Sequence, residues 1–118
     1  MNSGRVKERL RALGADLCGV AGVDRFWDAP EGYHPLDVLP TCRSVIVFGV
    51  RIAAGTLACR TAVPYTVVRN VLSDRMDKMA VQFCSEMEEA GVLAVPTRTN
   101  GSELDPRTGR WRSIVSAK

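Results

Sequence analysis

The sequence has few of the features that reveal a function directly. Aromatic residues make up only 6% of its 118 residues, a single histidine is present, and the net charge is just +3. Its longest apolar runs, such as residues 45–50, are far shorter than the roughly 20 residues that cross a bilayer. No apolar leader follows the first methionine. These absences argue against a membrane protein and a strongly basic nucleic-acid binder, so we expect a cytoplasmic protein.

Closely spaced cysteines are also missing. The four cysteines stand at positions 18, 42, 59 and 84, without the close pairs on which zinc and iron–sulfur sites usually draw. The missing leader argues against a disulfide framework as well. Cys18 and Cys84 fall within apolar patterns, which favours packing in the core. Cys42 and Cys59 fall in expected loops, and their role stays open.

What is present is an ordinary globular composition, with 46% apolar and 25% charged residues. Near the start, Val6, Leu10 and Leu13 recur at helical spacing with charged residues between them. This pattern predicts an amphipathic helix with Ser3 as its N-cap and Gly14 as its C-terminal stop.

Three short apolar segments, residues 16–23, 44–50 and 92–96, predict strands. The segment 44–50 is the clearest, and its unbroken apolar character predicts that both of its faces are covered. Four prolines and glycines punctuate residues 24–43, which predicts an irregular connection with one short helical turn near residues 36–39. Residues 51–63 are expected to form a loop.

The strongest periodicity runs through residues 67–90 and predicts a long helix, with Pro64 just before it and Gly91 just after it. Its apolar residues are spaced by three and four, close to the helical period. A stripe rich in methionine can line a cofactor, but packing in the core is the favoured interpretation. The stripe consists of Val68, Leu72, Met76, Met79, Phe83, Met87 and Ala90.

Strands on either side of a long helix predict a right-handed crossover onto one sheet. The expected fold is therefore α/β (α+β): a small mixed sheet with an N-terminal helix and one long central helix. We expect residues 1–118 to form a single N-terminal domain that is an incomplete piece of a longer chain. The proline and glycine of residues 105–109 give a turn signal, and its flanks predict a hairpin or an ordered loop.

No recognisable catalytic set is present, and His34 is expected to be solvated or structural. Arg51 follows the clearest strand, where ligands of open α/β sheets gather and a cation can hold a carboxylate or phosphate. Tyr65, Arg69 and Asn70 lie near the start of the long helix, where anions are favoured. These four residues are the candidate cofactor-binding residues, although Arg69 and Asn70 also fit a simple exposed helix surface.

A basic segment lies near the end of the sequence. Arg107, Arg110 and Arg112 could contact phosphates, and Trp111 could stack on a base. The favoured alternative is a solvated turn whose tryptophan packs against the sheet. A tRNA or another RNA is therefore one candidate partner.

Five short phrases occur in order at residues 16–21, 39–49, 65–72, 88–96 and 113–118. Together they resemble the N-terminal domain of epoxyqueuosine reductase and its iron–sulfur relatives. The resemblance implies a cobalamin-binding α/β domain, followed by a ferredoxin-like domain with 4Fe–4S clusters, in an enzyme that reduces an epoxide on a modified tRNA nucleoside. It further implies that these residues are the cofactor- or substrate-binding portion, inactive in isolation and without a cofactor of their own.

No catalytic residue is carried over from the family. The family's tyrosine usually follows a Gly-Arg-Asp run, where this chain has Ala62, Val63 and Pro64. The alternative to a reductase portion is a non-enzymatic α/β interaction module that binds protein or RNA through its long helix or its basic segment. An incomplete sheet leaves edges and apolar surface that invite pairing, so a homodimer is expected as one form of it.

Overall fold

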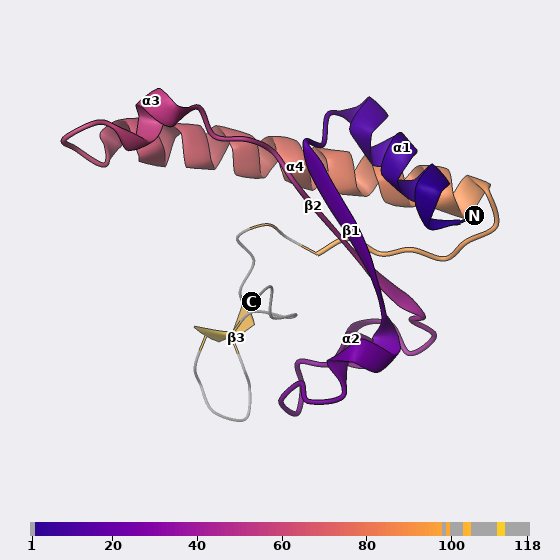
Figure 1. Ribbon diagram of the computed structural model, residues 1–118. Helices are drawn as coiled ribbons and strands as arrows, with labels where there is room; N and C mark the ends of the chain where they lie inside the picture. Colours follow the sequence, from indigo (N-terminus) through magenta and orange to yellow (C-terminus); the bar gives the residue numbers. More distant parts are fainter. Residues whose placement is uncertain (1, 98, 100–102, 105–110, 113–118) are drawn as a thin grey trace.

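The computed structural model describes residues 2–97, 99, 103–104 and 111–112, which form a small mixed α/β fold (Figure 1). The N-terminal helix and the single long helix confirm the expected fold class. The elements in order are α1 (Ser3–Leu13), β1 (Leu17–Gly22), the 3-10 helix η1 (Val23–Phe26), α2 (Pro35–Val38), β2 (Ser44–Gly49), α3 (Ala54–Leu57), α4 (Val63–Glu89), β3 (Glu103–Leu104) and β4 (Trp111–Arg112).

Helix α1 begins one residue earlier than the sequence indicates. Asn2 is the N-cap, because its side-chain oxygen accepts a hydrogen bond from the Arg5 backbone N–H at 2.9 Å, and Ser3 is the first helical residue. Gly14 ends the helix as predicted, with a left-handed φ of 114° that favours glycine. The helix buries Val6 and Leu10 against the rest of the molecule.

Strands β1 and β2 form an antiparallel pair in which Leu17 lies opposite Gly49 and Gly22 opposite Ser44. The inner face of this sheet packs against the core through Cys18, Val20, Ile46 and Phe48. The outer face leaves Leu17 74% exposed and Val47 58% exposed. The expectation that both faces of β2 are covered is therefore wrong, because the core helices α1 and α4 pack on one face only.

Helix α4 starts four residues earlier than the predicted start at position 67. Pro64 lies in its first turn, where backbone N–H groups have no partner within the helix, so the missing N–H of proline costs no hydrogen bond. It ends as predicted before Gly91, whose φ is 84°. The expected core stripe is confirmed in the second half of the helix. There the buried cluster contains Met79, Phe83 and Met87, packed with Val6, Leu10 and Ala15.

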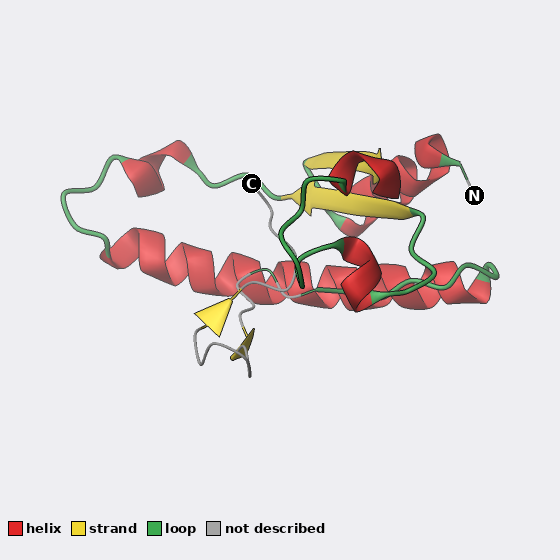
Figure 2. Ribbon diagram, turned by 90° about the horizontal axis from the view of Figure 1, so that it is seen from below, coloured by secondary structure: helices red, strands yellow, loops and turns green. Residues whose placement is uncertain are grey.

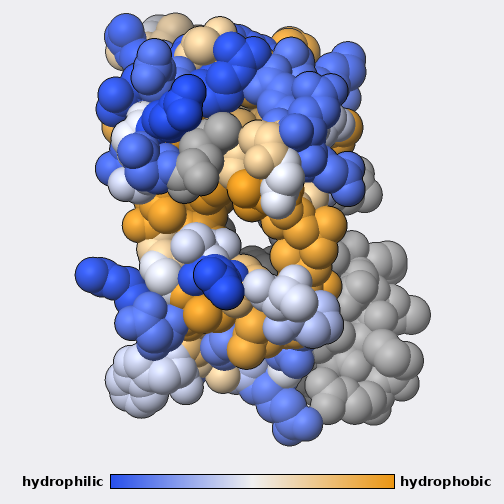
Figure 3. All heavy atoms as spheres, turned by 90° about the vertical axis from the view of Figure 1, so that its right-hand side faces the viewer, coloured by the Kyte–Doolittle hydropathy of each residue, from blue (hydrophilic) through white to orange (hydrophobic). Residues whose placement is uncertain are grey.

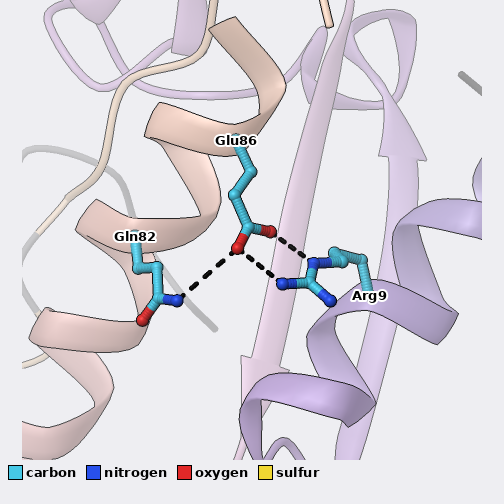
Figure 4. A network of polar contacts seen from close by, with 3 residues as sticks. All are labelled: Arg9, Gln82 and Glu86. Carbon is cyan, nitrogen blue, oxygen red and sulfur yellow. Dashed lines mark hydrogen bonds and ion pairs between the residues drawn. The ribbon is translucent and has the colours of Figure 1, made fainter. Parts of the chain in front are cut away.

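A charged contact joins α1 to α4 beside this core (Figure 4). The Arg9 guanidinium donates to both carboxylate oxygens of Glu86, with Nη2 2.6 Å from Oε1 and Nε in close contact with Oε2. Gln82 donates a further hydrogen bond to Oε1 at 3.5 Å. Hydrogen bonding by Arg9 lowers the pKa of Glu86 and raises the pKa of Arg9 itself.

The connection between the strands contains the expected short helix, α2. His34 caps it: its Nδ1 accepts from the Leu36 N–H at 3.1 Å, and its own N–H donates to the Asp37 carboxylate at 3.1 Å. The structural interpretation of the only histidine is thereby confirmed. The loop expected over residues 51–63 contains the single-turn helix α3 and the first residue of α4.

The predicted strand over residues 92–96 is wrong. After the end of α4 the chain turns back and runs beneath the helix (Figure 1), without pairing to β1 or β2. Val92 and Ala94 pack against the core, and further along Asp77 accepts hydrogen bonds from the Thr99 N–H and hydroxyl at 2.8 and 2.9 Å. Packing on the core thus accounts for Val92 and Ala94, whereas Leu93 and Val95 are 58% and 46% exposed. The predicted crossover onto one sheet is absent from the described residues, whose β1–β2 sheet is antiparallel.

The turn signal near the end of the sequence does mark a hairpin. β3 and β4 pair antiparallel, with Glu103 opposite Arg112 and Leu104 opposite Trp111. The turn itself, with Arg107 and Arg110, lies outside the described residues. Trp111 and Arg112 belong to β4, so the structure gives their backbone pairing, and the predicted RNA contact stays a prediction.

Candidate functional site

A hollow of about 760 Å³ opens between β2 and the segment formed by residues 91–97. Figure 3 shows it as a gap between two parts of the molecule, rimmed largely by apolar residues. Its size lies within the range of roughly 300–1,000 Å³ that is typical of small-molecule pockets. The volume of the hollow is therefore compatible with a small-molecule ligand.

β2, α4 and the segment after α4 form much of its wall, and α1, β1 and α2 also contribute lining residues. β2 contributes Val45, Ile46 and Phe48 along one side, and Leu93 and Val95 stand on the opposite side. α4 contributes Ala80, Phe83, Cys84 and Met87. The hollow exists because the segment after α4 lies against the core without reaching the edge of β2, so the space that a third strand would fill is left open.

Polar groups gather where the chain enters β2, at Thr41, Cys42, Arg43 and Ser44. The Cys42 thiol donates a hydrogen bond to the Ser44 carbonyl oxygen at 3.3 Å, which links two residues of this polar run. Arg43 is exposed and brings the positive charge among the lining residues. An anionic arm of a ligand would find its partner at this end of the hollow.

The chemistry of the lining suits binding better than catalysis. Burial raises the pKa of the Cys84 thiol, so it stays protonated near neutral pH and is a weak nucleophile. The described lining residues include no carboxylate and no imidazole, and a general acid–base pair needs such groups. The hollow therefore offers apolar surface for binding a ligand.

The four residues predicted to bind a cofactor lie on two parts of the chain, the loop after β2 and the first half of α4. Arg51 follows β2 and is exposed, with its backbone N–H bound to Asp16 Oδ2 at 2.7 Å. Tyr65 and Arg69 are four residues apart on α4 and share one face of it, whereas Asn70 lies about 100° further round the helix. None of the four lines the hollow. Their role as cofactor ligands stays a prediction.

Sequence reasoning missed the polar entrance at residues 41–44. It placed the ligand at the carboxyl end of β2, beyond Gly49, by analogy with open parallel sheets. In this antiparallel pair the polar lining residues stand instead at the amino end, next to Ser44. The available signal was the polar run Thr41-Cys42-Arg43-Ser44 directly before the apolar strand.

The described residues do not fit an iron–sulfur cluster. Among them, no group of three or more histidine, cysteine or acidic residues is placed to hold a metal ion. The cysteines lie apart: Cys18 packs against the core, Cys42 and Cys84 line the hollow, and Cys59 is exposed after α3. A corrinoid fits only in part. The hollow has apolar walls and a volume typical of small-molecule sites, but its lining contains no histidine to ligate cobalt.

Comparison with known proteins finds no matching family model, no similar curated protein and no similar solved structure. Within the described part of the chain, no helix is both long and apolar enough to span a membrane. The case for a function therefore depends on the hollow and on the exposed surfaces of the molecule.

Proposed function

We propose that this chain is the cofactor- or substrate-binding portion of an iron–sulfur-dependent reductase resembling epoxyqueuosine reductase, and that the hollow receives the apolar part of a bulky ligand. One observation carries the proposal. Two of the phrases that resemble the family, residues 39–49 and 88–96, supply the two facing walls of the hollow. Segments far apart in the sequence thus meet around one space of ligand size.

In this proposal the chain contributes binding and desolvation. The apolar walls cover the ligand, and Arg43 at the entrance orients an anionic group such as a phosphate. The reducing group is supplied from outside the described residues, since these form no cluster site. A cobalamin is the cofactor that the resemblance implies, and a tRNA nucleoside is the substrate that it implies.

Hydroxocobalamin, titrated into the purified chain and followed by equilibrium dialysis, tests the proposal. Leu93→Lys places a charge on a wall residue that is 58% exposed, so binding should weaken about tenfold or more while the fold persists. Leu17→Lys is the matched control, because Leu17 is 74% exposed and lies outside the hollow. An absence of uptake, or equal loss in both variants, would contradict the proposal.

A second candidate function, an interaction module, is favoured by the outer face of the β1–β2 sheet. That face carries only apolar residues and glycine, and Leu17 and Val47 are its most exposed members; the rest are Gly19, Ala21, Val45 and Gly49. Apolar surface of this kind marks interaction sites. The partner would be protein, including a second copy of the chain, or RNA bound at the β3–β4 hairpin.

Light scattering and an RNA-binding titration at low salt test this candidate. A clean monomer without RNA affinity would remove it. Binding of RNA that weakens steeply as salt rises would support a phosphate-contacting role for Arg107, Arg110 and Arg112.

A further inference from the structure

The face of α4 that points away from the core carries a second apolar stripe. Val63, Val67, Val71 and Val81 are 67%, 57%, 62% and 56% exposed. With 3.6 residues per turn they share an arc of roughly 80°, on the far side of the helix from the buried Met79 and Phe83. An exposed row of valines on a helix is unusual in a surface that stays in water.

Two opposite charges interrupt this stripe. Asp74 and Lys78 form an ion pair of 3.1 Å, and their side chains are 68% and 78% exposed. Both fall within the same arc as the valines. They stand two residues before and two residues after Met76, and Val71 and Val81 stand five residues before and five after it. About the level of Met76, Val71 is therefore placed symmetrically to Val81, and Asp74 symmetrically to Lys78, which carries the opposite charge.

This arrangement is self-complementary for two antiparallel helices. When a second α4 lies antiparallel with Met76 at the same level, each Val71 meets the partner's Val81 and each Asp74 meets the partner's Lys78. We propose that α4 forms a two-fold symmetric, antiparallel dimer with a second copy of the chain through this stripe. A two-fold interface requires the same surface on both copies, and the stripe provides it.

The charge pattern is what selects a second copy as the occupant. Apolar burial of Val71 and Val81 supplies affinity, whereas the two reciprocal charge pairs fix direction and register. A parallel pairing would set like charges against each other. The stripe is narrow, so the dimer is expected to be weak and dependent on protein concentration. It goes beyond the proposed ligand site, because none of the stripe residues lines the hollow.

Sedimentation equilibrium of the full chain over a range of concentrations tests the proposal. Asp74→Lys sets lysine against lysine at both reciprocal contacts, so the dissociation constant should rise by about tenfold or more. The double variant D74K/K78D exchanges the two charges and keeps the pattern self-complementary, so dimerisation should return. Glu8→Lys, the same charge change on the exposed surface of α1, is the matched control and should leave the dimer unchanged.

The exchange variant separates this dimer from any other use of the stripe. A partner of different chemistry would bind neither the single nor the exchanged variant, so failure of D74K/K78D to restore self-association would overturn the proposal. A wild-type chain that stays monomeric at all concentrations would also overturn it. Circular dichroism of each variant shows that α4 is retained. The result is independent of hydroxocobalamin uptake, so the two proposals fail separately.

Discussion

The two halves of α4 have the same apolar spacing but different surroundings. The second half packs against α1 and the β1–β2 sheet, and buries Met79, Phe83 and Met87. The first half extends beyond the sheet together with α3, as Figures 1 and 2 both show. We call α3 and residues 63–73 the arm. Helical periodicity thus identifies an apolar face along the whole helix, but only tertiary structure determines which part of that face is covered.

The arm is held together by local interactions. Its helix begins without a side-chain cap at Ala62, and the Thr61 hydroxyl accepts the Val63 N–H at 3.1 Å instead. Val68 and Leu72 are only half-buried. Helical stability in proteins comes mostly from packing of an apolar face. The arm should therefore contribute much less to the free energy of unfolding than the packed half of the helix.

The largest expected effect comes from removing a core side chain. Phe83→Ala should lower the free energy of unfolding by about 3 kcal/mol or more, because Phe83 is 5% exposed and leaves a cavity among its neighbours. Leu57→Ala, in the arm, should change it by no more than about 0.5 kcal/mol, since Leu57 is already 67% exposed. Urea unfolding of both variants gives the comparison. Similar losses would show that the arm is packed as tightly as the core.

Local patterns were enough to predict α1, α2, α4 and the two paired strands, but not the single turns η1 and α3. Glycines that can adopt positive φ mark the ends of α1 and α4, and β-branched runs mark β2, so these elements are decided within a few residues. The segment 92–96 could not be decided in this way. Its composition fits a strand, but pairing needs a neighbouring edge, and this segment packs its side chains on the core while the hollow separates it from β2.

The candidate site was harder to predict for the same reason. Arg51 was placed by a rule for parallel sheets, and the antiparallel pairing of β1 with β2 removes the basis of that rule. Arg43 is recognisable as a candidate ligand-binding residue only once the structure shows that residues 91–97 and β2 line the same hollow. A hollow formed by segments some fifty residues apart has no local signature in the sequence.

Two glycine-to-alanine substitutions, one next to the core and one in the arm, are expected to differ by an intermediate amount in their effect on stability. Gly14→Ala should destabilise the protein by about 1–2 kcal/mol, because its φ is 114° and an added Cβ would lie 2.5 Å from Arg75 Nη2. Gly55→Ala, in α3 of the arm, meets nothing within 4 Å and has no positive φ, so it should be neutral or stabilising by up to about 1 kcal/mol. Thermal unfolding measures both. Destabilisation by Gly55→Ala would mean that the arm makes a close contact at this position.

The smallest expected effect is a pH dependence at the contact between α1 and the packed half of α4. The hydrogen bonds from Arg9 lower the pKa of Glu86 in the folded protein, so the unfolded chain binds this proton more tightly. The contribution is therefore present at neutral pH and lost as the pH falls below the ordinary glutamate pKa of about 4.3. Glu86→Gln should lower the urea midpoint at pH 7, and the gap to the wild type should close towards pH 3. Glu8→Gln, at an exposed glutamate of α1, should show no gap at either pH. A gap that stays constant from pH 7 to pH 3 would mean that Glu86 stabilises the packed half by side-chain packing, since a charge interaction has to disappear when the carboxylate is protonated.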